Sequence, residues 1–163
     1  MDNNKVYRNV KEQIGYCGLW CGSCAVGNGA ISQLSRQLKQ MVTGYEVKSW
    51  GPEDINYDDL ITALSTLESK IDCKGCRKGG GNDTCKIREC AQEKKVADCF
   101  QCQDRTACEY KEELKNMWEG ASKAKMLFKT EDADEQQLIE QWEDKLKKSE
   151  QGCILFLRNK DTA

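Results

Sequence analysis

The spacing of the cysteines is the feature that most constrains what this chain can fold into. Seven cysteines fall within 36 consecutive residues, and polar or small side chains fill most of the gaps between them. Ordering each residue costs roughly 1–2 kcal/mol of conformational entropy, and such a segment has little apolar surface to offset that cost. We therefore expect cross-links, from disulfides, structural metal or iron–sulfur clusters. The positions are Cys73, Cys76, Cys85, Cys90, Cys99, Cys102 and Cys108.

Composition favours metal over disulfides. The chain has 163 residues, a formal net charge of −2 and an odd count of eleven cysteines. The N-terminus lacks the apolar core of a signal peptide, and no apolar run reaches the length of a membrane span, about 18 residues. We therefore predict a cytoplasmic protein without membrane association, whose thiols stay reduced. Because there is no histidine, an imidazole ligand or base is excluded and cysteine is the only ready soft ligand.

Apolar residues at helical spacing predict a helical hairpin after the first cysteines. Ile31, Leu34, Leu38 and Met41 recur at that spacing between Asn28, a candidate cap, and Gly44. A second apolar stripe covers residues 55–67, and Pro52 suits the first turn of that helix. We expect the two helices to lie antiparallel.

Further helices are expected in the second half of the chain. The pattern predicts a short helix within residues 87–96, one from residue 110 to about residue 128, and one that opens within residues 130–135. Trp118 and Trp142 lie on apolar stripes and are expected in the core. Residues 153–157 predict either a buried strand or a final helical turn, with Cys153 as a small buried residue.

These elements predict one mainly α domain over residues 1–163. Its parts are an N-terminal cysteine loop (1–27), the helical hairpin (28–70), a cysteine-rich metal-binding segment (71–109) and C-terminal helices (110–163). We expect the hairpin and the C-terminal helices to pack around the metal-clamped loop region.

The cysteine pairs separated by two residues, Cys73 with Cys76 and Cys99 with Cys102, let one loop bind an ion through two sulfurs. Eight thiolates would serve two Zn²⁺ ions. An economical grouping takes Cys73, Cys76, Cys85 and Cys90 around one ion, and joins Cys99, Cys102 and Cys108 to an N-terminal thiol around the other; an interleaved grouping is equally allowed. The ten candidate ligands are Cys17, Cys21, Cys24, Cys73, Cys76, Cys85, Cys90, Cys99, Cys102 and Cys108.

An iron–sulfur cluster (4Fe-4S) is the main alternative to zinc. Cys17, Cys21 and Cys24 have the spacing of the cluster-binding loop of radical S-adenosylmethionine enzymes, and Cys99, Cys102 and Cys108 resemble part of the motif that holds the auxiliary clusters of those enzymes. Those enzymes need a partial barrel of strand–helix units, whereas this chain is short and helical by pattern. The alternative is therefore a passive or electron-carrying cluster, since four thiolates suit iron–sulfur clusters as well as zinc.

Two lesser alternatives rest on weaker signals. Residues 20–24 are similar to the redox motif of thioredoxins, but Pro52 is the only proline and no good strand precedes the motif. Eight Lys or Arg against five acids in the central segment could indicate a nucleic-acid-binding zinc module. Zinc with four thiolates carries a net −2 charge, so nearby basic residues are expected as compensation, and we do not expect nucleic acid as a partner.

Taken together, the cysteine motifs resemble the bacterial and archaeal domain-of-unknown-function family 3795. The resemblance covers Ile14 to Cys108 and implies metal binding, with zinc as the usual metal and no established activity. One departure is Ala107, where the family often has proline. We therefore expect structural zinc in all-cysteine sites, lean against an enzyme, and expect the helical surface to meet a still unidentified protein partner. The motifs are Cys17-Gly18-Leu19-Trp20-Cys21, Cys73-Lys74-Gly75-Cys76, Ile87-Arg88-Glu89-Cys90-Ala91 with Glu93-Lys94, and Cys99-Phe100-Gln101-Cys102 to Cys108.

Overall fold

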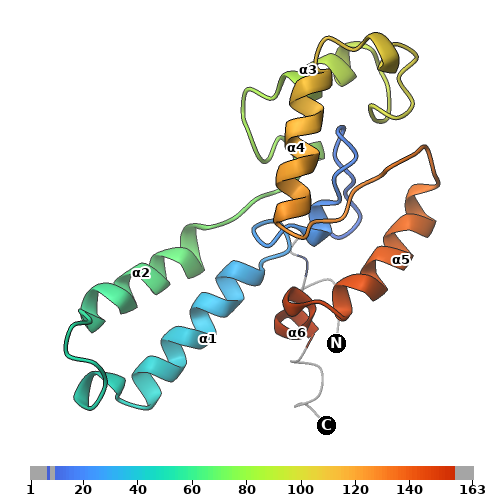
Figure 1. Ribbon diagram of the computed structural model, residues 1–163. Helices are drawn as coiled ribbons and strands as arrows, with labels where there is room; N and C mark the ends of the chain where they lie inside the picture. Colours follow the sequence, from blue (N-terminus) through green and yellow to red (C-terminus); the bar gives the residue numbers. More distant parts are fainter. Residues whose placement is uncertain (1–6, 8–9, 157–163) are drawn as a thin grey trace.

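The computed structural model describes residue 7 and residues 10–156, and their regular structure is helical (Figure 1). In this part of the chain, isolated β-bridges stand in place of strands. The mainly α prediction is confirmed. No helix within the described residues is long and apolar enough to cross a membrane. The helices are α1 (Ala30–Gly44), α2 (Tyr57–Lys70), α3 (Lys86–Glu93), α4 (Lys111–Lys123), α5 (Glu135–Lys147) and α6 (Glu150–Phe156).

Helices α1 and α2 form the predicted antiparallel hairpin (Figure 1). A short 3-10 turn, η3 (Val47–Ser49), and the loop that follows it connect them. The prediction that Pro52 lies in the first turn of α2 is wrong. Asn56 starts the helix instead, because its side-chain oxygen accepts hydrogen bonds from the backbone N–H groups of Asp58 and Asp59, at 3.2 Å each.

The hairpin projects away from the rest of the molecule, so the prediction that it packs around the cysteine segment is wrong (Figure 1). The reason lies in which face of α1 meets α2. Ser32 and Ser35 are buried there, and the Ser32 hydroxyl donates to the Glu68 carbonyl at 2.7 Å. The predicted apolar stripe of α1 turns largely outward, and the side chains of Leu34 and Met41 are 49% and 56% exposed.

Asn28 joins the start of α1 to the N-terminal loop and to α6. Its side chain is fully buried, and its Oδ1 accepts from the backbone N–H of Ala30 at 2.9 Å, but the N-cap of α1 is Gly29, one residue after the predicted cap. Its Nδ2 donates to the Gly22 carbonyl and to Oε1 of Gln151, at 3.0 Å each. One buried amide therefore fixes three segments that are distant in sequence.

The main apolar core lies between the N-terminal loop and the C-terminal helices. Trp20 is fully buried, its ring centroid lies 6.0 Å from that of Trp142, and its indole N–H donates to the Lys11 carbonyl. Burial of such rings contributes several kcal/mol to folding. The members of this core are Tyr7, Ile14, Trp20, Ala30, Trp142, Leu146 and Leu155.

Helix α4 ends at Lys123, five residues before the predicted end near Phe128. Lys125 adopts a left-handed conformation (φ 55°), and the N–H of Met126 bonds to the Ala121 carbonyl at 2.8 Å, which is the Schellman end of a helix. The chain then runs beside the N-terminal loop: Trp20 N–H donates to the Leu127 carbonyl, and Lys129 N–H donates to that of Gly18, both at 2.9 Å. This pairing brings residues 127–129 to the cysteine region.

The apolar run from residue 153 is helical as far as α6 reaches, and Leu157 lies outside the described residues. Cys153 is exposed, so its predicted burial is wrong. Gly152 and Leu155 face inward instead, and a Cβ on Gly152 would lie 2.0 Å from the Leu146 carbonyl oxygen. Trp142 is in the core as predicted, whereas Trp118 is only half-buried.

Replacing Gly18 with alanine is expected to cost more than about 2 kcal/mol of folding free energy. Gly18 has a φ of +85°, and a Cβ there would lie 2.5 Å from Cε2 of Phe100. Gly120 is the matched control, because it lies within α4 and a Cβ there has no neighbour within 4 Å. Gly120→Ala should stabilise by about 0.5–1 kcal/mol. Urea unfolding of both variants checks the contrast, and equal midpoints would contradict it.

Candidate functional site

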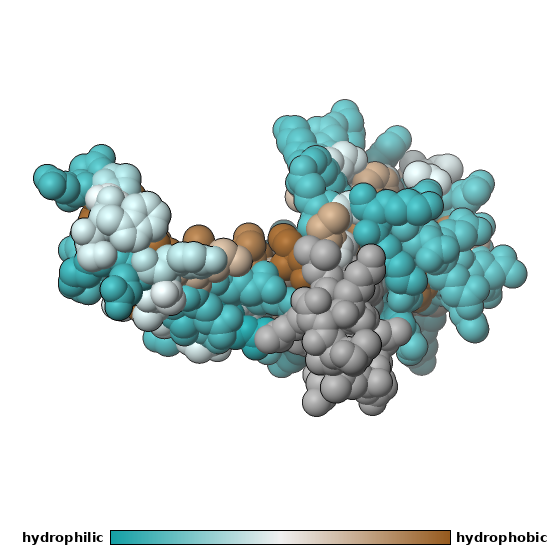
Figure 2. Space-filling view, turned by 90° about the horizontal axis from the view of Figure 1, so that it is seen from below, coloured by the Kyte–Doolittle hydropathy of each residue, from teal (hydrophilic) through white to brown (hydrophobic). Residues whose placement is uncertain are grey.

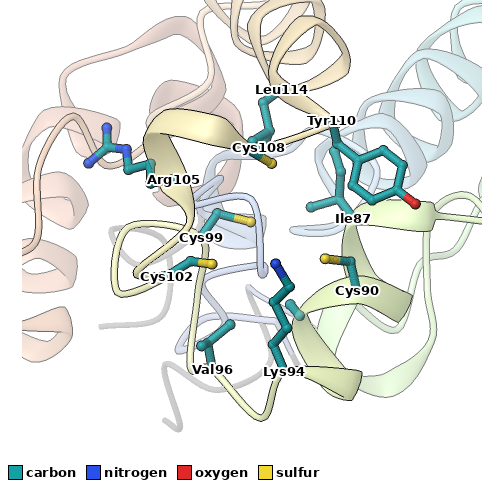
Figure 3. A pocket seen from close by; sticks show the side chains of 11 residues that line it. Ile87, Cys90, Lys94, Val96, Cys99, Cys102, Arg105, Cys108, Tyr110 and Leu114 are labelled. Atoms are coloured by element: carbon teal, nitrogen blue, oxygen red, sulfur yellow. The ribbon is translucent and has the colours of Figure 1, made fainter.

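Four cysteines line one small cavity, which we call the α3–α4 site. The sulfurs of Cys90, Cys99, Cys102 and Cys108 turn toward a common space in Figure 3. Cys90 lies on α3, Cys108 precedes α4, and the other two lie on the loop between these helices. The cavity measures about 30 Å³, which is roughly the volume of one water molecule in the liquid. It therefore has room for one small ion.

The loop that carries Cys99 and Cys102 is fixed by Asp98. This carboxylate is fully buried, and its Oδ1 accepts from the backbone N–H of Phe100 at 2.7 Å and of Gln101 at 3.3 Å. Its Oδ2 accepts from Nζ of Lys129 at 2.7 Å, with both side chains fully buried. The backbone N–H of Cys99 donates to the Tyr16 carbonyl at 2.8 Å. The thiol positions are thus set by hydrogen bonds to three separate segments.

Lys94 reaches toward the four thiols from the C-terminal end of α3 (Figure 3). Its ammonium donates to Asp104 at 2.8 Å. This hydrogen bond raises the pKa of Lys94 and lowers the pKa of Asp104. A positive charge at this place offsets negative charge that four thiolates would bring around an ion.

A second group of cysteines lies where the N-terminal loop meets residues 73–85, and we call it the N-terminal site. An ideal Cβ on Gly15 would lie 3.4 Å from the sulfur of Cys76 and 3.5 Å from that of Cys17, so these two sulfurs flank one point. Burial raises the pKa of Cys17 to about 12, and the neighbouring thiols of Cys76, Cys21 and Cys85 add to this effect. Burial likewise raises the pKa of Cys21 to about 11, with contributions from Cys76, Cys24 and Cys73.

Glycines shape the turn that presents Cys73 and Cys76. Gly75 has a φ of +85°, and a Cβ on it would lie 2.0 Å from Oε1 of Gln13. A Cβ on Gly80 would lie 2.8 Å from the sulfur of Cys73. The backbone N–H of Gly75 also donates to that sulfur, at 3.4 Å. The turn is therefore built so that backbone closes around the two thiols.

Two arginines hold this turn and the loop after it. Nε of Arg77 donates to the Ile14 carbonyl at 2.8 Å, and its guanidinium lies 4.1 Å from the ring centroid of Tyr16. Arg88 is buried, and its guanidinium donates to the carbonyls of Gly80, Asn82 and Asp83. The glycine-rich loop is thus ordered by these hydrogen bonds.

The structure places the thiols of the ten predicted ligands in different sets from those of the economical grouping. Cys90 lies with Cys99, Cys102 and Cys108. Cys85 lies close to Cys17, together with the thiols from residues 21–24 and 73–76. The two sets follow one another along the chain, and the division between them falls at the start of α3: Cys85 precedes the helix and Cys90 is its fifth residue. The short helix therefore separates the two thiols between the sites.

Each of the eleven cysteines is a free thiol in the structure. As the side chains stand, no group of three or more Cys, Asp or Glu within residue 7 and residues 10–156 is arranged to hold a metal ion. Burial raises the pKa of Cys99 to about 12, and the thiols of Cys108 and Cys102 raise it further, so this thiol is neutral near pH 7. Ten of the eleven cysteines therefore gather into two sets, and Cys153 belongs to neither.

Several residues that shape these sites escaped the sequence reading. The sequence gives Lys129 no predicted role, and Asp98 counts only as one of the five acids of the central segment. A lysine and an aspartate 31 positions apart give no sequence signal of a contact. Arg88 was read as charge compensation for an ion, yet its donors are used by carbonyls. Only contacts distant in sequence reveal these roles.

A family model described as "Protein of unknown function (DUF3795)" matches residues 13–113. That range includes all ten candidate ligands and stops within the first turn of α4. No curated protein and no solved structure matches the chain.

Proposed function

The chain belongs to the DUF3795 family, whose description names no activity, and we propose from the chain's own thiols that it binds metal through two all-cysteine sites. Zinc is the metal we propose, in a structural role. The observation that carries the proposal is the convergence of four sulfurs on one ion-sized cavity at the α3–α4 site. Those sulfurs come from positions up to 18 residues apart, Cys90 to Cys108.

The donor set fits zinc. Structural zinc sites take four ligands, and four thiolates are a common set. Apolar side chains, including Ile87 and Leu114, form much of the rest of the lining of the α3–α4 site, and no carboxylate lines it. Each zinc–sulfur bond is about 2.3 Å long, so the thiols must turn toward a shared point on binding. Rotation about χ1 moves a cysteine sulfur without moving the backbone.

Binding requires the thiols to lose their protons. Burial and neighbouring thiols raise the pKa of Cys17 and of Cys99, so these two thiols are neutral near pH 7. A bound dication would supply the charge that makes the thiolates favourable, and its binding would release protons. Lys94, beside the α3–α4 site, offsets the remaining negative charge. A site closed by four thiolates cross-links the chain and has no open position for catalysis.

The N-terminal site brings six thiols together, two more than one zinc ion takes. Cys17 and Cys76 are two of the ligands that we propose there, because their sulfurs flank one point, at 3.5 and 3.4 Å from an ideal Cβ on Gly15. The presence of six thiols is also the observation that favours an iron–sulfur cluster, the alternative to zinc, at this site. The cavity of the α3–α4 site, by contrast, is too small for a cluster of four irons and four sulfides without rearrangement.

Metal analysis of anaerobically purified protein tests the proposal. We expect about two zinc ions per chain and no absorption band in the visible range. Stoichiometric iron and sulfide, with a broad absorption band at about 400 nm, would contradict the zinc proposal and support the iron–sulfur alternative. Protein that retains neither metal and takes up neither on reconstitution would contradict both.

Serine variants test which thiols share an ion. Cys90→Ser/Cys99→Ser removes two ligands of the same site in the structure, so about one zinc ion should remain. If those residues served different ions, as in the economical grouping, both ions would be lost. Cys153→Ser is the control, because Cys153 is exposed and belongs to neither group, and its zinc content should stay unchanged. The readout is zinc per chain by elemental analysis.

A further inference from the structure

The hairpin carries an unpartnered apolar surface. Within the described part of the chain, the large hydrophobic side chains that are exposed all belong to this one element. Figure 2 shows hydrophobic residues in a row along the hairpin, on the floor of a hollow between its tip and the rest of the molecule. Isolated exposed apolar residues are common, but a gathered set marks an interaction site. The hairpin patch, as we call it, consists of Leu34, Leu38, Met41, Tyr45, Trp50 and Ile55.

The patch is a helix face, followed by the turn at the tip. Leu34, Leu38, Met41 and Tyr45 follow one another at spacings of three or four residues, so they share one side of α1 and its C-terminal end. From Leu34 to Tyr45 that side runs for about 17 Å. Small side chains, Ser32 and Ser35, fill the contact with α2 on another side. The leucine face is therefore free for a partner.

The tip adds a polar group that lacks a partner. Tyr57 is 6% exposed, and its hydroxyl has no hydrogen-bond partner among the residues that the structure describes. It lines a surface pocket of about 420 Å³ together with Trp50, Pro52 and Ile55. A buried hydroxyl without a hydrogen bond costs about 1–3 kcal/mol. A ligand that enters this pocket with a donor or acceptor would remove that cost.

Charge selects the kind of partner. Around the tip, five carboxylates accompany a single lysine: Glu46, Glu53, Asp54, Asp58 and Asp59 against Lys48, which is itself paired with Asp58. A second copy joined through the same patch would bring the same carboxylates to the interface, and like charges there are unfavourable. An anionic membrane is disfavoured for the same reason. A basic partner is favoured.

We propose that the hairpin patch binds a basic amphipathic helix of a partner protein. The apolar face of that helix would lie on Leu34, Leu38 and Met41, as in other helix-in-groove complexes. Lysine or arginine residues at the flanks would face the carboxylates of the tip, and an anchor side chain would fill the pocket beside Trp50 and Tyr57. Exposed Trp, Tyr and Met are the residue types enriched in protein interfaces. The proposal does not depend on metal at the cysteines.

A designed peptide tests it with the full-length protein. The probe is about 18 residues long, with leucine at helical i, i+3, i+4 spacing and lysine at the flanking positions. Isothermal titration calorimetry should give a micromolar Kd that weakens at least about tenfold in Leu34→Ser/Leu38→Ser. Gln40→Ser/Thr43→Ser is the control, since both residues are exposed on another side of α1, and this variant should bind as the wild type does. Circular dichroism confirms that each variant is folded.

Three further outcomes decide the matter. A peptide of the same composition with its leucines scrambled, and one with glutamate at the flanks, should each bind at least about tenfold more weakly. The proposal is overturned if either of these peptides binds as tightly as the lysine-flanked probe, or if that probe does not bind. A wild-type dimer in light scattering that Leu34→Ser/Leu38→Ser converts to monomer assigns the patch to a second copy and also overturns it. Co-sedimentation of the protein with phosphatidylserine vesicles that is lost in Leu34→Ser/Leu38→Ser would assign the patch to a membrane and would likewise overturn the proposal.

Discussion

Removing the metal is expected to unfold the two thiol-bearing loops, residues 73–85 and 99–108, while the rest of the fold persists. Structural zinc in small sites has apparent binding free energies of about 10–16 kcal/mol at neutral pH, which exceeds the stability of many whole domains, about 5–15 kcal/mol. Few buried apolar side chains lie in these loops, with Phe100 the largest. The core around Trp20 and Trp142 contains none of the proposed ligands.

Segment-resolved hydrogen exchange with and without chelator measures this effect. Protection should fall by at least about a hundredfold in the two loops and change little in the α1–α2 hairpin and in α5. The hydrogen bonds from Arg88 to the glycine-rich loop do not need metal, so they limit how much protection this loop loses. Elemental analysis verifies that the metal is completely removed. If loop protection and the melting curve are then unchanged, hydrogen bonds and packing suffice to order the loops. The structural-zinc proposal would then fail.

Replacing Lys129 with methionine is expected to lower the free energy of unfolding by about 3–5 kcal/mol. The change leaves the fully buried carboxylate of Asp98 without its ion-pair partner at 2.7 Å. That carboxylate also orders the loop carrying Cys99 and Cys102, through the N–H groups of Phe100 and Gln101. Urea unfolding of zinc-loaded protein gives the stability, and hydrogen exchange should show increased opening of residues 98–102.

The partner substitution and the double variant separate charge from packing. Asp98→Asn keeps an acceptor for the two N–H groups, and Lys129 keeps a second partner, Asp132 at 3.6 Å, so the loss should be smaller than in Lys129→Met. Asp98→Asn/Lys129→Met removes both charges and should recover more than half of the stability lost in Lys129→Met. If the loss of unfolding free energy in the double variant equals the sum of the losses in the two single variants, the pair contributes through shape and not through charge.

The prediction of helices from the sequence was accurate where a helix has a clear apolar period and a local end signal. Helix α1 and the hairpin follow from residues 28–70, and α5 from the stripe around Trp142. Boundaries that depend on partners distant in sequence were wrong: α4 ends at Lys123 because residues 127–129 pair with the N-terminal loop. The face that α1 presents was also wrong, since period alone does not say whether an apolar stripe meets the protein or a partner.

The sequence by itself determined the chemistry available to this protein: many thiols, no imidazole, and helices on both sides of a central segment too polar to fold by apolar burial alone. Only the tertiary structure decided how the thiols divide, because Cys85 and Cys90 lie on either side of the first turns of α3 and meet different segments of the chain. It also decided that Asp98 and Lys129 form a buried pair and that α1 keeps a free apolar face. Spacing along a chain fixes only neighbours within a few residues, whereas contacts between distant segments depend on how every element packs at once.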